Sequence, residues 1–146
     1  NLKDIDLIIA GNHGWGHDNL KFNPPNGRMK LLEYISPENL VELYSNAQCF
    51  VYPSIYEGFG IPILEAFSCG CPVITSNISS MPEVGGRAAI YADPLSISDI
   101  AEKIKYVLDL SSSKRKELIE RGISQAEKFS WEKTAKETIK IYEEMA

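Results

Sequence analysis

Short apolar segments that alternate with helical patterns constrain the fold more than any other feature of the sequence. Each segment is a mainly apolar run instead of a strict alternation of apolar and polar residues, and Gly11 and Pro53 stop two of them. Buried parallel strands have this composition, because helices cover both faces of their sheet. The predicted strands are residues 5–10, 29–35, 48–52, 72–75 and 88–91. This order predicts the α/β class, as a Rossmann-like open parallel sheet with helices on both faces.

Helix-start and helix-stop residues separate the predicted strands. Ser36 is a suitable N-cap before Pro37, and Gly70 stands where a helix C-terminus favours glycine. Ser96 and Asp99 form a capping-box pattern. Helices are predicted after Ser36 and over residues 63–68, 96–110, 113–129 and 131–145. Because no repeat or linker divides the chain, residues 1–146 are predicted to form a single domain.

Charge and composition exclude several classes of partner. Of the 146 residues, 44% are hydrophobic and 24% are charged, which argues against disorder. The net charge of −5, without a dense stripe of Lys or Arg, predicts no nucleic-acid partner. No apolar run approaches the ~20 residues that cross a bilayer, and no signal peptide is visible. The three cysteines fit reduced thiols, so the predicted location is cytoplasmic.

A glycine-bearing loop after the third predicted strand carries the chemistry. Gly58 and Gly60 lie just before a helix that Pro62 begins, and this arrangement suits a pyrophosphate. A dinucleotide-binding fingerprint is a poor match, because Ile63 stands where its third glycine belongs. A Walker phosphate loop is excluded, because no Gly-Lys-Ser/Thr is present.

Two carboxylates, Glu57 and Glu65, bracket this loop. Carboxylates accept hydrogen bonds from neutral hydroxyls, so the two are candidates for gripping a donor sugar and a ribose on either side of the phosphates. The structural alternative is that Glu65 favours its helix N-terminus and Glu57 caps a turn. On the residues alone, the structural alternative is the stronger interpretation.

Residues 57–65, Glu-Gly-Phe-Gly-Ile-Pro-Ile-Leu-Glu, resemble the Glu-x7-Glu motif of the retaining glycosyltransferases of family four, the GT-B type called glycosyl transferases group one. The resemblance extends to residues 52–60, 65–74, 76–84, 88–94 and the closing Phe-Ser-Trp at 129–131. Together these segments cover nearly the whole chain in the family's order. The resemblance implies that the chain is the C-terminal, donor-binding lobe of such an enzyme.

The resemblance assigns roles to the loop residues. It implies that Glu57, the candidate catalytic residue, contacts donor-sugar hydroxyls. The amides of Gly58, Phe59 and Gly60 face the phosphates and the leaving sugar, and Ile61 belongs to the same donor-binding segment.

The resemblance also implies roles outside the loop. Glu65 holds the ribose hydroxyls, and the nucleobase packs near Tyr34 and Ile35. The last helix, residues 131–146, is expected to pack toward an N-terminal acceptor-binding lobe. No cofactor or metal is expected. His13 and His17 supply only two ligands, so they make no metal site.

The implied reaction is transfer of a hexosyl group from a nucleoside diphosphate sugar, GDP-mannose or a UDP-hexose, with retention of configuration. The expected pathway is polysaccharide biosynthesis, and a peripheral association with the cytoplasmic face of a membrane stays open. Two alternatives stay open as well: a non-catalytic nucleotide-sugar-binding module, and one subunit of a split transferase.

Several family features are missing from the sequence. The family's lobe begins with a further strand and a Gly-Arg loop followed by a Lys, and no matching segment precedes residue 5. Losing one preorganised donor of this kind costs about 3–4 kcal/mol of transition-state stabilisation. We therefore expect this chain alone to be an inactive fragment whose acceptor-binding lobe is absent.

Overall fold

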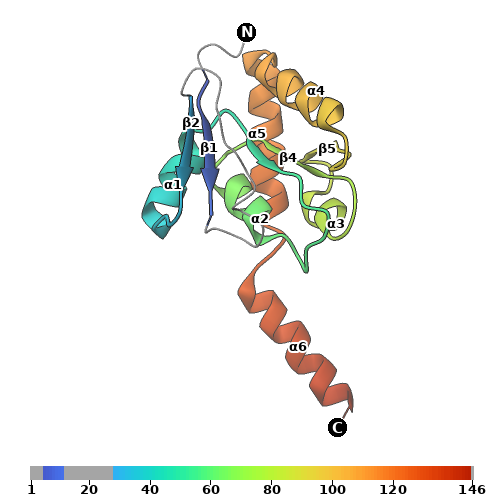
Figure 1. The fold of residues 1–146 in the computed structure, drawn as a ribbon. Helices are drawn as coiled ribbons and strands as arrows, with labels where there is room; N and C mark the ends of the chain where they lie inside the picture. The colour runs from blue at the N-terminus through green and yellow to red at the C-terminus, as the bar shows by residue number, and fades with distance from the viewer. Residues whose placement is uncertain (1–4, 12–27, 146) are drawn as a thin grey trace. The chain divides into compact units, whose positions relative to one another are not determined.

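The computed structural model describes residues 5–11 and 28–145 (Figure 1). By its internal contacts the chain divides into two compact units, Asn1–Leu40 and Val41–Ala146, and each is described by itself. The assignment of both units to one domain stays a prediction. The two histidines of the weighed metal motif, His13 and His17, lie outside the described residues.

The first unit contains two parallel strands, β1 (Leu7–Ala10) and β2 (Met29–Leu32), with Leu7 opposite Met29. β2 ends three residues earlier than predicted, so Tyr34 and Ile35 lie after the strand instead of within it. Helix α1 (Pro37–Asn46) then begins where the sequence indicates, because Ser36 Oγ accepts a hydrogen bond from the Asn39 amide at 3.3 Å.

The second unit is built on three parallel strands in the order β3 (Phe50–Tyr52), β4 (Val73–Ser76) and β5 (Ile90–Ala92). All of β4, the central strand of this sheet, is buried, including the hydroxyl residues Thr75 and Ser76 at its end. Helix α2 (Ile61–Ser68) connects β3 to β4, and the short helix α3 (Met81–Gly85) connects β4 to β5. The parallel strands and intervening helices confirm the predicted α/β class.

Three longer helices complete the second unit: α4 (Ile97–Leu108), α5 (Ser112–Ala126) and α6 (Trp131–Met145). Val107 of α4 packs on β4 and β5 in a buried cluster with Ile74 and Ala92. The predicted cap of α4 is confirmed in part. Ser96 Oγ accepts from the Asp99 amide at 3.2 Å, but the Asp99 carboxylate accepts from the Asp93 amide at 2.7 Å instead of completing the box.

Helices α2 and α5 pack tightly against each other, and this contact supports the loop before α2 (Figure 1). A side chain at Gly122 of α5 would place its Cβ 2.7 Å from the ring of Phe67, which is too close for any residue but glycine. Gly70, at φ +71°, ends α2, with its amide bonded to the Phe67 carbonyl and the Cys71 amide bonded to Ala66. These paired bonds form the Schellman motif that the glycine predicts.

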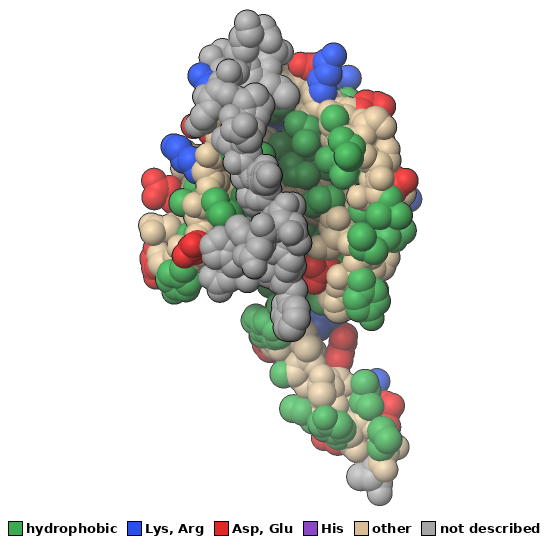
Figure 2. Space-filling model, in the orientation of Figure 1, with side chains coloured by type: hydrophobic (Ala, Val, Ile, Leu, Met, Phe, Trp, Pro, Cys, Tyr) green, Lys and Arg blue, Asp and Glu red, His purple; other side chains and the backbone are tan. Residues whose placement is uncertain are grey.

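Helix α6 has no buried residue. Its large apolar side chains stay exposed, and Figure 2 shows hydrophobic side chains along its surface. They are Trp131, Ile139, Ile141, Tyr142 and Met145. The packing of α6 toward another lobe stays a prediction. Within the described residues, no helix is long and apolar enough to cross a membrane.

Candidate functional site

The loop between β3 and α2, residues 53–60, is exposed at Gly58 and Phe59 but buried at Gly60. Gly60 is the N-cap of α2 and has φ +103°, a left-handed conformation that other residues adopt only with strain. Gly60 has no side chain to cap α2, but its carbonyl accepts a hydrogen bond from the Ile63 amide at 3.0 Å, and Pro62 has no N–H. A Cβ added at Gly58 would meet no atom within 4 Å, so this backbone is accessible. The exposed main chain of Gly58 and Phe59 therefore lies next to the N-terminus of α2, the positive end of that helix.

The Glu57 side chain is held in one orientation by two hydroxyl groups. Its Oε1 accepts a hydrogen bond from the Tyr52 hydroxyl at 2.6 Å and another from Ser54 Oγ at 2.7 Å. These two bonds, with Tyr52 the stronger, lower the pKa of Glu57 below its ordinary value, so the group is a carboxylate at neutral pH. Burial, followed by the bond to Glu57, raises the pKa of Tyr52 to about 12, so Tyr52 stays a donor.

The second carboxylate oxygen of Glu57, Oε2, has no hydrogen-bond partner within the part of the chain that the structure describes. With one oxygen fixed and the other open, the carboxylate can accept hydrogen bonds from an incoming hydroxyl without reorganising. This arrangement differs from a turn cap, because the bonds to Glu57 come from side chains and not from the loop amides.

The main chain of Glu57 is braced by the segment after β4. Ser79 Oγ accepts from the Glu57 amide at 3.2 Å and donates to the Glu57 carbonyl at 3.1 Å. Ser80 Oγ donates to the same carbonyl at 3.2 Å. Ser79 has φ +59°, an unusual conformation for a residue other than glycine, which its surroundings must hold in place.

The end of β4 itself also holds the loop. Thr75 Oγ1 donates to the Tyr52 carbonyl at 2.9 Å, and Ser76 Oγ donates to the Ser54 carbonyl. Both β4 side chains are buried, so their hydroxyls would be costly to leave unpaired. The loop is therefore preorganised by hydrogen bonds that reach from a buried central strand.

Glu65 is the fifth residue of α2 and is exposed. The effect of a helix dipole falls off within the first turn, so this position gains little from the helix N-terminus. Its Oε2 accepts from the Tyr44 hydroxyl at 3.5 Å, a long bond. Tyr44 is buried and packs edge-on against Phe50 at 5.1 Å between ring centroids. Burial, with Glu65 second, raises the pKa of Tyr44 above its ordinary value.

The remaining predicted donor-binding residues are not all in the same unit. Phe59 and Ile61 are both partly exposed in and next to the loop of the second unit. Tyr34 and Ile35 belong to the first unit, where Tyr34 is 80% exposed and Ile35 is half-buried. Their role beside a nucleobase stays a prediction.

Sequence reasoning missed the residues that hold the loop. Tyr52 and Ser54 were visible as neighbours of Glu57, but nothing in the sequence showed that both hydroxyls point to one carboxylate oxygen. Ser79 and Ser80 lie more than twenty residues along the chain and contact Glu57 only after folding. The hydroxyl residues that end β4, Thr75 and Ser76, were a sequence signal for their own bonds to the loop carbonyls, but not for the bonds of Ser79 and Ser80.

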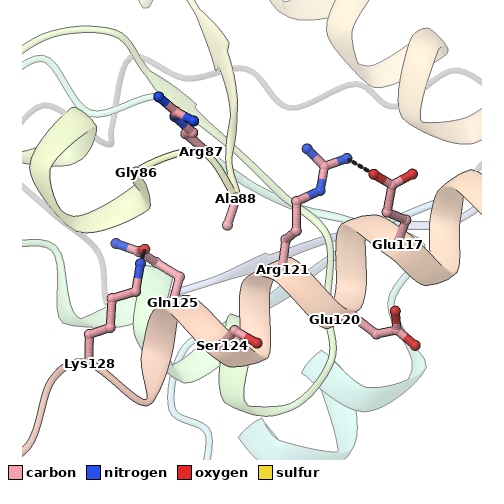
Figure 3. A pocket seen from close by; sticks show the side chains of 9 residues that line it. All are labelled: Gly86, Arg87, Ala88, Glu117, Glu120, Arg121, Ser124, Gln125 and Lys128. Carbon is pink, nitrogen blue, oxygen red and sulfur yellow. Dashed lines mark hydrogen bonds and ion pairs between the residues drawn. The ribbon is translucent and has the colours of Figure 1, made fainter.

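A polar groove lies elsewhere on the second unit, between α5 and the turn before β5 (Figure 3). It contains none of the predicted donor-site residues. Two of its cations are held by their neighbours, since Arg121 pairs with Glu117 at 3.3 Å and Lys128 Nζ donates to Gln125 Oε1 at 2.7 Å. Its lining is Gly86, Arg87, Ala88, Glu117, Glu120, Arg121, Ser124, Gln125 and Lys128.

Among residues 5–11 and 28–145, no three His, Cys, Asp or Glu side chains gather in a group that could hold a metal ion. The three cysteines are free thiols, and burial raises the pKa of Cys71 to about 12.

Comparison with known proteins places this geometry in a family. The family model described as glycosyl transferases group 1 matches residues 1–125. An O-antigen chain mannosyltransferase B of Escherichia coli is 44% identical over 140 residues, which is 93% of this chain and 36% of that protein. The serotype-specific mannosyltransferase WbdA of Escherichia coli is 38% identical over 102 residues, or 70% of this chain and 12% of that protein.

The fold agrees with solved structures as well. The structure of a glycosyltransferase from Rickettsia africae matches this chain with a TM-score of 0.81 and 21% identity. The match covers 97% of this chain and 40% of the Rickettsia chain. The chain belongs to the group 1 glycosyl transferases, which have the GT-B fold. It spans about a third or less of the length of the two mannosyltransferase relatives.

Proposed function

We propose that this chain supplies the donor-binding site of a hexosyltransferase that uses a nucleoside diphosphate sugar and retains the configuration of the transferred sugar. The observation that carries the proposal is the Glu57 carboxylate, anionic and fixed through one oxygen, next to a glycine loop at the start of a helix. The loop offers N–H groups to phosphates, and the carboxylate offers an acceptor to sugar hydroxyls.

In this proposal each part of the donor meets a different part of the loop. The diphosphate lies over the amides of Gly58, Phe59 and Gly60, and the carboxylates of Glu57 and Glu65 lie to either side of it. The sugar hydroxyls donate to the open Oε2 of Glu57, and the ribose hydroxyls donate to Glu65. An anion beside the sugar also stabilises the positive charge that develops at its ring during transfer.

Mannose is the sugar that we propose, with GDP-mannose as the donor. Support comes from the two relatives above, both of which are named mannosyltransferases. UDP-hexoses are the alternative donors. One relative is an O-antigen chain enzyme, which supports a growing surface polysaccharide as the acceptor.

The partner that we propose is an acceptor-binding lobe, which α6 contacts through its exposed apolar residues. We also propose that transfer needs no metal ion and takes place at the cytoplasmic face of a membrane. Addition of EDTA to the complete enzyme tests the first of these proposals, because a metal-dependent transferase would lose its activity.

Calorimetric titration with GDP, UDP, ADP and GDP-mannose tests the proposed donor. We expect selective binding of GDP and GDP-mannose, and weaker binding of both by Glu65→Ala. Glu83→Ala, an exposed carboxylate of α3, is the matched control and should leave both affinities unchanged. Equal affinity for all four ligands, or no effect of Glu65→Ala, would contradict the proposed role of Glu65.

A further inference from the structure

Phe129 lies in the joint between α5 and α6, directly before the N-cap residue of α6. Ser130 is that N-cap, because its Oγ accepts from the Lys133 amide at 3.1 Å. An apolar residue in the position of Phe129 commonly packs against the fourth residue of its own helix. Here the fourth residue is Thr134, whose hydroxyl donates to the Ser130 carbonyl at 3.1 Å and which offers little apolar surface. Phe129 therefore lacks the usual apolar partner in α6.

The partner of Phe129 is instead in the glycine loop. The rings of Phe59 and Phe129 meet edge to face, with 5.7 Å between centroids and an interplanar angle of 78°. This is a preferred geometry for two aromatic side chains. Phe59 is flanked by Gly58 and Gly60, so it is the one residue in the Gly-Phe-Gly segment whose side chain can hold the backbone in place.

The packing of α5 on α2 brings the two rings together. A Cβ on Gly70 would lie 3.5 Å from Ile119, and a Cβ on Gly122 would lie 2.7 Å from Phe67. Contact positions thus advance along α5 as they go back along α2, which means that the helices are antiparallel. Continued in the same direction, this register places the end of α5 beside the loop that precedes α2, where Phe59 and Phe129 meet.

We propose that Phe129 is a positioning residue that fixes the Gly58-Phe59-Gly60 backbone through the ring of Phe59. Phe129 acts through Phe59 and contacts no part of the donor. The inference rests on the proposed function, because it assigns the fixed backbone to the diphosphate of the donor. It also ties the order of this loop to the joint from which α6 begins.

Amide order parameters from NMR relaxation, with GDP titrations beside them, test the proposal. In the unmodified chain the amides of Gly58, Phe59 and Gly60 should have the order parameter of rigid backbone, about 0.85. In Phe129→Ala the order parameters of these amides should fall below about 0.6. GDP should bind about two- to tenfold more weakly, because that factor corresponds to the interaction free energy of one aromatic pair. Phe129→Tyr keeps the ring and should restore both values.

Trp131→Ala is the matched control, because Trp131 is an aromatic residue two positions along the chain and is 78% exposed. It should leave the loop order parameters and the GDP affinity unchanged. Unchanged loop order parameters in Phe129→Ala would overturn the proposal. If Phe129→Ala does not fold, Phe129→Leu keeps apolar volume without the ring. In that variant only the amides of the loop should have lower order parameters. A uniform loss of order through α5 and the strands would contradict a positioning role.

The two proposals fail in different ways. If the unmodified chain binds no GDP, the proposed function is contradicted, and the order parameters alone decide whether Phe129 holds the loop. If GDP binds but Phe129→Ala leaves the loop rigid, the proposed function stands and the inference about Phe129 is wrong.

Discussion

The β3–α2 loop and helix α6 are both predicted to contact another molecule, but they differ in how firmly the rest of the second unit holds them. The loop is held from several sides: Tyr52 and Ser54 fix the Glu57 side chain, and Ser79 and Ser80 fix its main chain. Helix α6 has no buried residue. A site for a small molecule binds more tightly when its side chains are already fixed in the binding geometry, as they are in the loop. The apolar surface of α6, in contrast, is not covered by other residues of its own unit.

The largest expected difference between the two regions is in stability. Phe67→Ala removes a fully buried ring that packs between α2 and α5, and should lower the free energy of unfolding by about 3–5 kcal/mol. Trp131→Ala at the start of α6 should change it by less than about 0.5 kcal/mol, because that side chain is exposed. Urea denaturation of both variants measures the contrast. Similar losses in the two variants would show that α6 is packed in solution.

The second expected effect is on the donor sugar. Glu57→Gln keeps the shape of the side chain and removes its charge, so hydrogen bonds from sugar hydroxyls should weaken by about 1.5–3 kcal/mol, or roughly tenfold to a hundredfold in affinity. GDP lacks the sugar, so its affinity should change little. Calorimetric titration of GDP-mannose and GDP measures the difference. An equal loss for both ligands would place Glu57 at the nucleotide instead.

A smaller effect is expected in the pH dependence of donor binding. Because hydrogen bonds lower the pKa of Glu57, the carboxylate contributes to stability and binding at neutral pH, and this contribution is lost as the pH falls through the lowered value. Tyr52→Phe removes the larger of the two causes, so the acid limb of GDP-mannose binding should move to higher pH. Ser54→Ala should move it less. An unchanged acid limb in Tyr52→Phe would show that Glu57 does not titrate in binding.

The smallest expected effect is in α6. Three pairs of opposite charge, each four residues apart, run along this helix: Glu132–Lys136, Lys133–Glu137 and Lys140–Glu144. Such exposed pairs contribute about 0.2–0.5 kcal/mol each, and more when the Glu comes first. Lys136→Ala should therefore reduce the helical content of α6 slightly more than Lys140→Ala, as amide chemical shifts at low salt would show. High salt should remove the difference, and a difference that survives high salt would contradict an ionic cause.

The elements around the loop could be predicted from the sequence because their signals are local. Gly70 marks the end of α2, as the structure confirms, whereas α2 begins at Ile61, two residues before the predicted start at residue 63. Strand ends were less certain, since β2 ends at Leu32 while the apolar pattern continues to Ile35. The partner of Asp99 was also mistaken, because the neighbouring Asp93 amide competes for the same carboxylate.

The support of the site could not be predicted, because it depends on residues that only the fold brings together. Glu57 was found through its motif, but its bond to Ser80 spans 23 positions. The ring of Phe129 reaches Phe59 only because glycine at position 122 lets α5 approach α2 closely. Sequence spacing records none of these contacts, whereas backbone conformations such as that of Gly60 leave a residue-type signal.

The most direct test of the account is to map the amide chemical shifts of the chain as GDP-mannose is added. The account predicts the largest changes at Gly58, Phe59 and Gly60, with saturation, and no change at Gly86 or Ser124 in the polar groove of Figure 3. Changes centred on the groove, with the glycine loop unaffected, would contradict the assignment of the β3–α2 loop as the donor site.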